Sequence, residues 1–493
     1  MTTLPAATLS PLPRIIQGGM GIGVSDWRLA HAVSRLGHLG VVSGTALDTL
    51  FVRRLQDGDP GGHMRRGLAA FPWRRTAEAI LERHFIPGGR APGDPYRLLP
   101  MWRRRVSPDR ERIAVAAAFV EVWLAREGHD GPVGMNLLTK LQLPNPATLY
   151  GAILAGVDAV LMGAGIPREI PGLLDDLAEH RATSIRLDVE GERGDEVRAE
   201  FDPGAHWAFE GVAPADGAGE GGLPAVARPL FFPIVASNSL ARMLARKANG
   251  RVDGFVVEGP TAGGHNAPPR GTLETNARGE PVYGERDEVD LEELAGLGLP
   301  FWLAGGEGSP EGLERAVATG AEGIQVGTLF AYAEESGLAP ELRERVLAEV
   351  RAGGVGLHTD LKASPTGFPF KVVQIEGTGS SEEVYAARGR ICDLGYLRAP
   401  VRRADGRIDY RCPAEPVDTW VKKGGRAEET EGRRCLCNAL MADVGVAQER
   451  DEGAEPALVT SGDELLRLGR FLGERTSYRA ADVVEYLTGG GAG

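Results

Sequence analysis

The sequence predicts an α/β fold: a closed (β/α)8 barrel of the TIM type with long insertions and a mainly helical C-terminal appendage. Roughly eight short apolar runs recur along the chain, and most are followed by a helical pattern. Repeated strand–helix units favour an all-parallel sheet covered by helices. The alternative, an open doubly wound sheet, usually carries G-x-G-x-x-G at its first strand–helix turn. Residues 18–23 read Gly-Gly-Met-Gly-Ile-Gly, a poor match, so the barrel is favoured.

Local patterns place the individual elements in order along the chain. Strands are short runs rich in Val, Ile, Leu and Phe that end near glycine or a polar residue. Helices begin after a capping residue, such as Ser25 or Asp26, and show apolar residues at helical spacing. The predicted strands are 14–20, 39–44, 133–137, 159–162, 230–235, 254–258, 301–304 and 323–327. The predicted helices between them are 27–36, 108–126, 148–155, 240–248 and 310–319.

Two long insertions and a C-terminal region interrupt this alternation. Residues 60–130 are rich in Arg, Pro and Trp, and they could line a channel for an acyl chain, form a lid, or make the contact of a homo-oligomer. Residues 188–228 are acidic and Gly-rich, which is typical of an exposed hairpin or a flexible loop. We therefore expect the barrel over 12–385 and a helical cap over 386–493, with a disordered tail at 489–493.

Composition and charge exclude several classes of partner. The chain has 493 residues, with 55 Lys and Arg against 68 Asp and Glu, a net charge of −13. That balance argues against nucleic acid or an anionic membrane surface as the main partner. No apolar run is long enough for a transmembrane helix, and the first 13 residues lack the features of a signal peptide, so a cytoplasmic protein is expected.

Glycine residues lie at the ends of the last two predicted strands. In a barrel of this type the site lies at the C-terminal ends of the strands, and the loops after strands 7 and 8 often hold a phosphate group. Gly305-Gly306 and Gly327-Thr328 fall at those two places. Backbone N–H groups in glycine-rich turns form a ready anion site. The spacing therefore fits a phosphate-bearing ligand, although ordinary tight turns would look the same.

Three segments together resemble one known family. They are Pro13–Met20, the strand end Glu258–His265 with its Gly-Gly-His, and Leu303–Gly306 followed by Gly320–Phe330. In this order they are similar to the FMN-dependent nitronate monooxygenases, once called 2-nitropropane dioxygenases, a family that also includes FMN-dependent enoyl-thioester reductases. The resemblance covers about residues 12–375.

The resemblance implies an FMN site. The turn after the first strand would lie against the flavin ring, and the glycine-rich turns would hold the phosphate. The implied cofactor contacts are Gln17, Gly18, Gly19, Met20, Asn136, Gly263, Gly264, Gly305, Gly306, Gln325, Val326, Gly327 and Thr328. Several could instead belong to plain turns, because Gly and Asn are common turn formers.

His265 is the candidate catalytic residue. It follows two glycines at a strand end, and an imidazole can take a proton from a substrate carbon or return one. In the family the equivalent His is the proposed base in nitronate oxidation or a proton-handling residue in reduction. The loop that follows it departs from the family pattern: it carries two prolines and Arg270, either a contact for an anionic substrate group or a surface residue. By resemblance, residues 362–371 fold back near the flavin.

The four cysteines all lie late in the chain. They are Cys392, Cys412, Cys435 and Cys437, the last two in a C-x-C. Four thiolates could hold a structural zinc ion or an iron–sulfur cluster. The spacing matches no standard pattern and contains no C-x-x-C, so four reduced thiols are the alternative.

Three functions compete. The first is oxidation of a small carbon acid by O2 in the manner of nitronate monooxygenases, with His265 as the base. The second is an NAD(P)H-dependent enoyl-thioester reductase, which needs no separate nucleotide motif if the nicotinamide docks over the flavin. The third is a barrel that binds a phosphorylated ligand without flavin chemistry, because fold alone does not give function.

Overall fold

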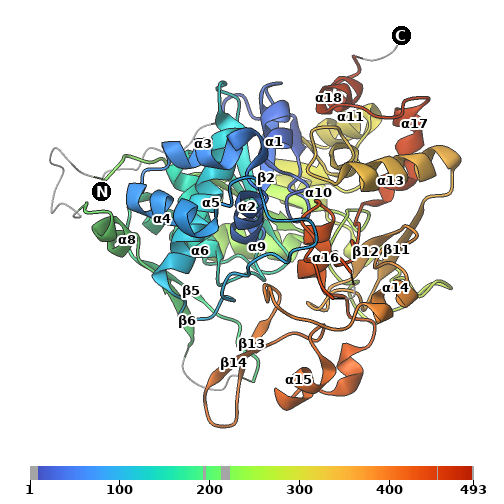
Figure 1. Ribbon diagram of the computed structural model, residues 1–493. Helices are drawn as coiled ribbons and strands as arrows, with labels where there is room; N and C mark the ends of the chain where they lie inside the picture. The colour runs from blue at the N-terminus through green and yellow to red at the C-terminus, as the bar shows by residue number, and fades with distance from the viewer. Residues whose placement is uncertain (1–8, 192–195, 213–222, 452, 491–493) are drawn as a thin grey trace.

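The computed structural model describes residues 9–191, 196–212, 223–451 and 453–490 of the chain (Figure 1). Eight parallel strands close into a barrel in the order β1-β10-β9-β8-β7-β4-β3-β2. Their bounds are β1 Ile15–Gln17, β2 Leu39–Ser43, β3 Val133–Leu138, β4 Ala159–Gly163, β7 Leu230–Val235, β8 Phe255–Glu258, β9 Phe301–Ala304 and β10 Gly323–Val326. The predicted fold class is confirmed.

Alternate residues of each strand fill the inside of the barrel. In β1, Ile16 points inward and Ile15 packs against the surrounding helices, as expected where successive side chains face opposite sides of a sheet. Phe232 and Trp302 pack inside with tilted rings whose centroids are 4.9 Å apart, and Trp302 Nε1 donates to Pro13 O at 2.7 Å. The interior is therefore a packed core, and the open space lies at the strand ends.

The helices lie outside the barrel and follow the strands (Figure 1). Asp26 caps the first of them, accepting hydrogen bonds from the N–H groups of Arg28 and Leu29. Those before β10 are α1 Trp27–Ser34, α2 Leu47–Gln56, α3 His63–Ala70, α4 Arg74–His84, α5 Pro108–Arg126, α6 Asn145–Leu154, α7 Ile170–Ala178, α8 Pro203–Phe209, α9 Asn238–Lys247, α10 Leu291–Ala295 and α11 Pro310–Ala318. The 60–130 excursion is thus ordered, with α3 and α4 packed on α5.

The second predicted insertion, 188–228, contains one strand of a hairpin whose other strand precedes it. Strands β5 (Thr183–Arg186) and β6 (Arg198–Phe201) pair antiparallel, and α8 follows. Residues 192–195 and 213–222 of this insertion lie outside the described residues.

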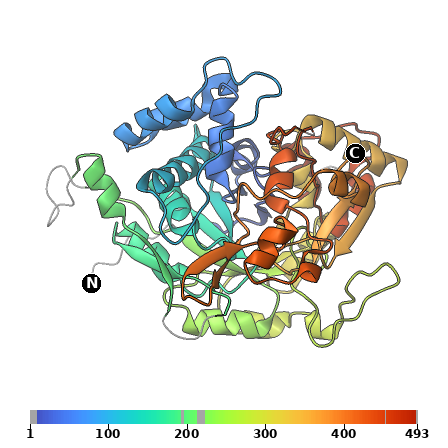
Figure 2. The same ribbon diagram turned by 60° about the horizontal axis from the view of Figure 1, so that its bottom comes forward.

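The chain after β10 packs alongside the barrel (Figure 2). It forms two antiparallel strand pairs and several short helices. In order they are α12 Thr328–Ala331, α13 Pro340–Ala352, β11 Gly356–Asp360, β12 Phe370–Gln374, α14 Glu382–Ala387, β13 Ala399–Arg402, β14 Ile408–Arg411, α15 Val417–Lys422, α16 Leu436–Ala442, α17 Leu468–Leu472 and α18 Ala480–Leu487. The C-terminal region is mainly helical, with the β13–β14 pair in addition; the division at 385 stays a prediction. Residues 491–493 of the expected tail lie outside the described residues.

In the described ranges, no helix combines the length and the apolar character needed to cross a bilayer.

Candidate functional site

A cavity of about 440 Å³ opens at the C-terminal ends of the barrel strands, a size typical of small-molecule sites. Its walls come from the ends of β3, β4, β7, β8, β9 and β10, from the turn after β1, and from residues of the C-terminal region. Twelve of the predicted site residues line it: Gly18, Gly19, Met20, Asn136, Gly263, Gly264, His265, Gly305, Gly306, Gln325, Gly327 and Thr328.

Gln17 and Val326, which were also expected at the site, stand behind its wall. Gln17 is fully buried: its Nε2 donates to Ser25 Oγ at 2.9 Å, and its Oε1 accepts from Val41 N at 3.0 Å. Val326 is a core residue whose carbonyl accepts from Gly18 N at 2.9 Å. Both residues fix the turn after β1 without facing the cavity.

Asn136 and Gly19 meet at one side of the cavity. Asn136 Nδ2 donates to Gly19 O at 3.2 Å. A Cβ at position 19 would lie 2.3 Å from Asn136 Cβ, so this close approach requires glycine. Asn136 thereby orients the turn, and its Oδ1 is left without a partner.

One end of the cavity is suited to an anion. Gly305 and Gly306 have φ of 88° and 78°, left-handed values that favour glycine. The N–H groups of Gly306, Gly327 and Thr328 donate to no residue within the described ranges. All three residues line the cavity, so these amides are available to a ligand with acceptor atoms.

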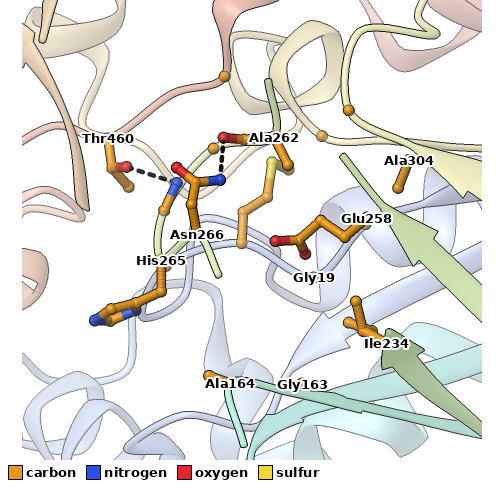
Figure 3. A pocket seen from close by; sticks show the side chains of 18 of the residues that line it. Gly19, Gly163, Ala164, Ile234, Glu258, Ala262, His265, Asn266, Ala304 and Thr460 are labelled. Atoms are coloured by element: carbon orange, nitrogen blue, oxygen red, sulfur yellow. Dashed lines mark hydrogen bonds between the residues drawn. The ribbon is translucent and has the colours of Figure 1, made fainter. Parts of the chain in front are cut away.

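His265 lines the cavity on the loop that follows β8 (Figure 3). Its Nε2 is hydrogen-bonded to Ser364 Oγ at 2.7 Å, and its ring packs against Phe368 and Phe370, which also line the cavity. Burial lowers the pKa of His265 to about 4, so the imidazole is neutral at pH 7. Ser364 in turn is hydrogen-bonded to Thr366 Oγ1 at 2.8 Å. A neutral ring held at one nitrogen can accept a proton at the other.

Glu258 is a cavity residue that the sequence interpretation missed. It ends β8, and its carboxyl group points into the pocket (Figure 3). Its carboxylate accepts no hydrogen bond and forms no ion pair within the described part of the chain, and burial raises its pKa to about 8. At pH 7 the group is therefore mostly a neutral acid that can donate a hydrogen bond. An acidic residue closing an apolar strand was the available signal.

The C-terminal region supplies a second set of missed residues, in the segment 459–464. Gly264 N donates to Thr460 Oγ1 at 3.0 Å, and Asp463 N donates to Thr261 O at 2.9 Å. These bonds join the segment to the loop that carries His265. The cavity is thus closed on this side by residues far along the chain from the barrel strands.

Within the described residues, five buried polar atoms around the cavity have no hydrogen-bond partner. They belong to Asn136 Oδ1, Asn266 Oδ1, Gln325 Oε1, Tyr332 Oη and Ser461 Oγ. Buried polar groups are normally paired, so five such atoms on one cavity indicate a polar ligand. Together with the free amides, they fit a ligand with several donors and acceptors and one anionic end.

Arg270 lies outside the cavity. Its side chain donates to the backbone carbonyls of Arg286 and Ala236, and it is exposed. It therefore acts as a surface residue that ties two loops together.

The four cysteines gather around a second, small cavity. All are free thiols, and burial raises the pKa of Cys392 to about 12 and also raises those of Cys412, Cys435 and Cys437. In the part of the chain that the structure covers, no group of three or more His, Cys, Asp or Glu residues is placed to hold a metal ion. The metal site stays a prediction.

Fold and cavity together define the class: a (β/α)8 barrel with a pocket of small-molecule size at the strand ends, lined by the glycine turns and His265. Residues 227–366 match the family model described as nitronate monooxygenase, which confirms the resemblance over that part of the chain. This range contains the loops of His265, of Gly305-Gly306 and of Gly327-Thr328.

Two curated proteins are similar in sequence. A 5-hydroxy-7a-methyl-1-oxo-octahydro-1H-indene-4-carboxyl-CoA dehydrogenase of Mycobacterium tuberculosis is 27% identical over 250 residues, 48% of this chain and 64% of that protein. A probable nitronate monooxygenase of Staphylococcus haemolyticus is 34% identical over 97 residues, 20% of this chain and 26% of that protein. The chain thus spans less than two thirds of the length of each relative.

Solved structures resemble the chain over nearly its whole length. FabK from Thermotoga maritima has a TM-score of 0.45 at 18% identity and covers 96% of this chain and 91% of its own. Nitroalkane oxidase from Streptomyces ansochromogenes has a TM-score of 0.44 at 15% identity, and the match covers 97% of this chain and 95% of that protein. The enoyl reductase domain of MlnA from Bacillus amyloliquefaciens has a TM-score of 0.45 at 12% identity, and the match covers 97% of this chain and 93% of that domain.

Proposed function

We propose that this chain is an FMN-dependent oxidoreductase that oxidises a small carbon acid with O2 in the manner of nitronate monooxygenases. The observation that carries the proposal is the cavity at the strand ends, where unpaired amides, five unpaired buried polar atoms and His265 converge. The family match over residues 227–366 supports the same class of activity.

The cavity residues fit FMN. The turns at Gly305-Gly306 and Gly327-Thr328 would hold the phosphate, and the Gly18–Met20 turn with Asn136 and Gln325 would hold the ring. The unpaired oxygens of Asn136 and Gln325 can accept hydrogen bonds from ring N–H groups. FMN, when bound, supplies the electron transfer between substrate and O2, and the protein supplies orientation and proton handling.

His265 is the proton-handling residue in this proposal. Its neutral ring accepts a proton at Nδ1, which makes no hydrogen bond within the described ranges, while Nε2 stays on Ser364. The protonated Glu258 can donate a hydrogen bond to an acceptor atom of the ligand. The two groups lie on the same cavity, and at pH 7 one is a neutral base and the other a neutral acid.

A second candidate is an NAD(P)H-dependent enoyl-thioester reductase. One specific observation favours it: the Mycobacterium tuberculosis relative is named for an acyl-CoA substrate. The cavity also has apolar walls that could accept an acyl group, formed by Ile166, Ile234, Leu240 and Phe368.

An anaerobic absorbance titration distinguishes these functions. The purified protein receives NADH, then NADPH, then an alkyl nitronate. We expect a flavin band that only the nitronate bleaches. Rapid bleaching by a nicotinamide would favour the reductase, and thioesters would then be tested as substrates. Absence of a flavin band, with no binding of added FMN, would contradict both flavoenzyme proposals and favour a barrel that binds another phosphorylated ligand.

A further inference from the structure

The segment 459–464 lies outside the matched family domain and yet forms a wall of the cavity at its anion-accepting end. Gly462 N donates to Thr328 Oγ1 at 3.1 Å. A Cβ on Gly263 would meet Gly462 N at 2.7 Å, and a Cβ on Gly462 would meet Thr328 Oγ1 at 2.9 Å. The segment is therefore wedged between the two loops that flank this end, with no room for larger residues.

Ser461 presents an unused hydroxyl group at this place. The residue is 4% exposed and lines the cavity, and among the residues that the structure describes its Oγ has no hydrogen-bond partner. It neighbours the buried Tyr332 hydroxyl, whose oxygen likewise has no hydrogen-bond partner at normal distance in the described ranges. Leaving two buried hydroxyl groups unpaired is unfavourable. We therefore expect a ligand group in the cavity beside them that accepts their hydrogen bonds.

The groups that surround this end are mainly donors. Gly306, Gly327 and Thr328 offer free N–H groups, and Ser461 and Tyr332 offer hydroxyl hydrogens. Because Thr328 Oγ1 already accepts from Gly462 N, its own hydrogen also remains free. A ligand group with several acceptor oxygens and no hydrogen to give, such as a phosphate dianion, satisfies this set.

Glu464 is the acidic residue of the segment that also lines the cavity. Its Oε1 accepts from Gly308 N at 2.5 Å, and burial raises its pKa, which favours the uncharged form. A carboxyl group that is bonded to an amide and readily protonated repels a neighbouring anion less than a free carboxylate does.

We propose that Ser461 donates a hydrogen bond to the phosphate group of the flavin, so that the C-terminal region completes the phosphate site of the barrel. The inference rests on the proposed FMN binding. It assigns the phosphate end to two separate parts of the chain: the two glycine turns of the barrel and a segment more than 130 residues further on.

Comparison of FMN with riboflavin tests the assignment, because riboflavin has the same ring and lacks the phosphate. Apoprotein of the wild type, of Ser461→Ala and of the control Ser477→Ala is titrated with each flavin, and binding is followed by quenching of flavin fluorescence. Ser477 lies in the same region, on the surface, where its Oγ bonds Glu334. We expect Ser461→Ala to weaken FMN about tenfold, the scale of one lost charge-assisted hydrogen bond, and to leave riboflavin unchanged.

Three results would overturn the inference while leaving FMN binding intact. They are equal weakening of both flavins by Ser461→Ala, no weakening of either, and a wild type that binds FMN and riboflavin equally well. A wild type that binds no flavin would instead contradict the proposed function. If Ser461→Ala fails to fold by circular dichroism, Ser461→Cys, with similar volume and a weak donor, is expected to show the same selective loss.

Discussion

His265 is neutral at pH 7 because it is packed against Phe368 and Phe370, and this sets the pH range in which it can act. Burial lowers its pKa to about 4, so the neutral ring persists on the alkaline side of that value. We predict that His265→Ala keeps its flavin and loses at least about a hundredfold in kcat/KM, the scale for a removed general base. We also predict that the wild-type acid limb lies near pH 4 instead of near 6.5.

Steady-state oxidation of a neutral nitroalkane, whose α-proton His265 would remove, from pH 3.5 to pH 8 measures both effects. His358→Ala is the matched control, since His358 lies on β11 near Glu280 and outside the cavity. An unchanged rate in His265→Ala would remove this residue from the proton-handling role. An acid limb near pH 6.5 would show that the imidazole is more accessible to water than its surroundings indicate.

Burial raises the pKa of Glu258, whereas it lowers that of His265, and the raised pKa affects the stability of the fold. In the unfolded chain its carboxyl group ionises near pH 4.5, whereas in the folded chain burial holds the pKa at about 8. The folded state therefore loses stability as pH rises from 4.5 to 8, and little more changes above 8. We predict that Glu258→Gln is stabilised relative to the wild type between pH 5 and pH 8, by on the order of 1–4 kcal/mol.

Urea unfolding of apoprotein at pH 5 and pH 8 checks the sign. Asp443, whose pKa burial also raises to about 8, is unchanged in both proteins and cancels in the difference. A pH-independent difference between Glu258→Gln and the wild type would mean that the carboxyl group is already ionised in the folded state.

At the scale of elements, the turn between β9 and α11 depends on two left-handed glycines. A Val at position 306 would have to adopt φ near 78°, and its Cβ would lie 3.0 Å from Thr261 Oγ1. We predict that Gly306→Val is purified without flavin. Gly298→Val is the control: Gly298 has φ of 73°, has open space around it and lies outside the cavity. Both variants place a Val at a left-handed φ and so carry similar backbone strain. A difference in flavin content between them therefore reports loss of the phosphate site.

The absorbance ratio of flavin to protein measures this difference in variants that remain folded. We expect near-normal flavin content in Gly298→Val and less than about a tenth in Gly306→Val, a difference that one lost anion site can produce. Full occupancy in a folded Gly306→Val protein would contradict the role given to this turn.

The start of α16 brings Cys435 and Cys437 to the cavity that Cys392 and Cys412 also line. Because burial raises the pKa of every one of these thiols, the reactive thiolate is scarce at pH 7. We predict that a thiol reagent labels fewer than one cysteine per native chain and all four after denaturation with a chelator. Fewer than four after denaturation would indicate a disulfide, and a stoichiometric metal in untagged protein would support the metal prediction.

The strands and the glycine turns could be predicted because their signals are local. Each barrel strand is an apolar run of a few residues that ends near a glycine or a polar residue, and the structure places all eight near the expected positions. Gln17 shows where prediction from local sequence fails. It lies in a motif that resembles a flavin contact, but its amide group is hydrogen-bonded to Ser25 and Val41. Thr460 could not be found in this way, because its partner Gly264 is 196 residues away.

The whole molecule is tied together by a buried polar network that joins the N-terminal helices to the C-terminal region. Asp48 of α2 is 3% exposed and accepts from Arg110 of α5, from Trp102 Nε1 at 2.9 Å and from the Tyr396 hydroxyl. Arg53 extends this contact by donating to Val446 O at 2.6 Å. The region after 385 is therefore expected to unfold together with the barrel.

Asp48→Ala tests this connection. Removing the carboxylate leaves the buried Arg110 without its counter-ion, which costs about 3–5 kcal/mol in comparable sites. We predict a loss of this size in the free energy of unfolding, with flavin release and loss of near-UV circular dichroism in one shared transition. Asp109→Ala is the control, because Asp109 is 65% exposed and its ion pair with Arg112 is worth less than about 1 kcal/mol. Two separate transitions, or a loss no larger than that of the control, would show that the C-terminal region is an independent folding unit. Its residues would then reach the cavity only when the folded region docks on the barrel.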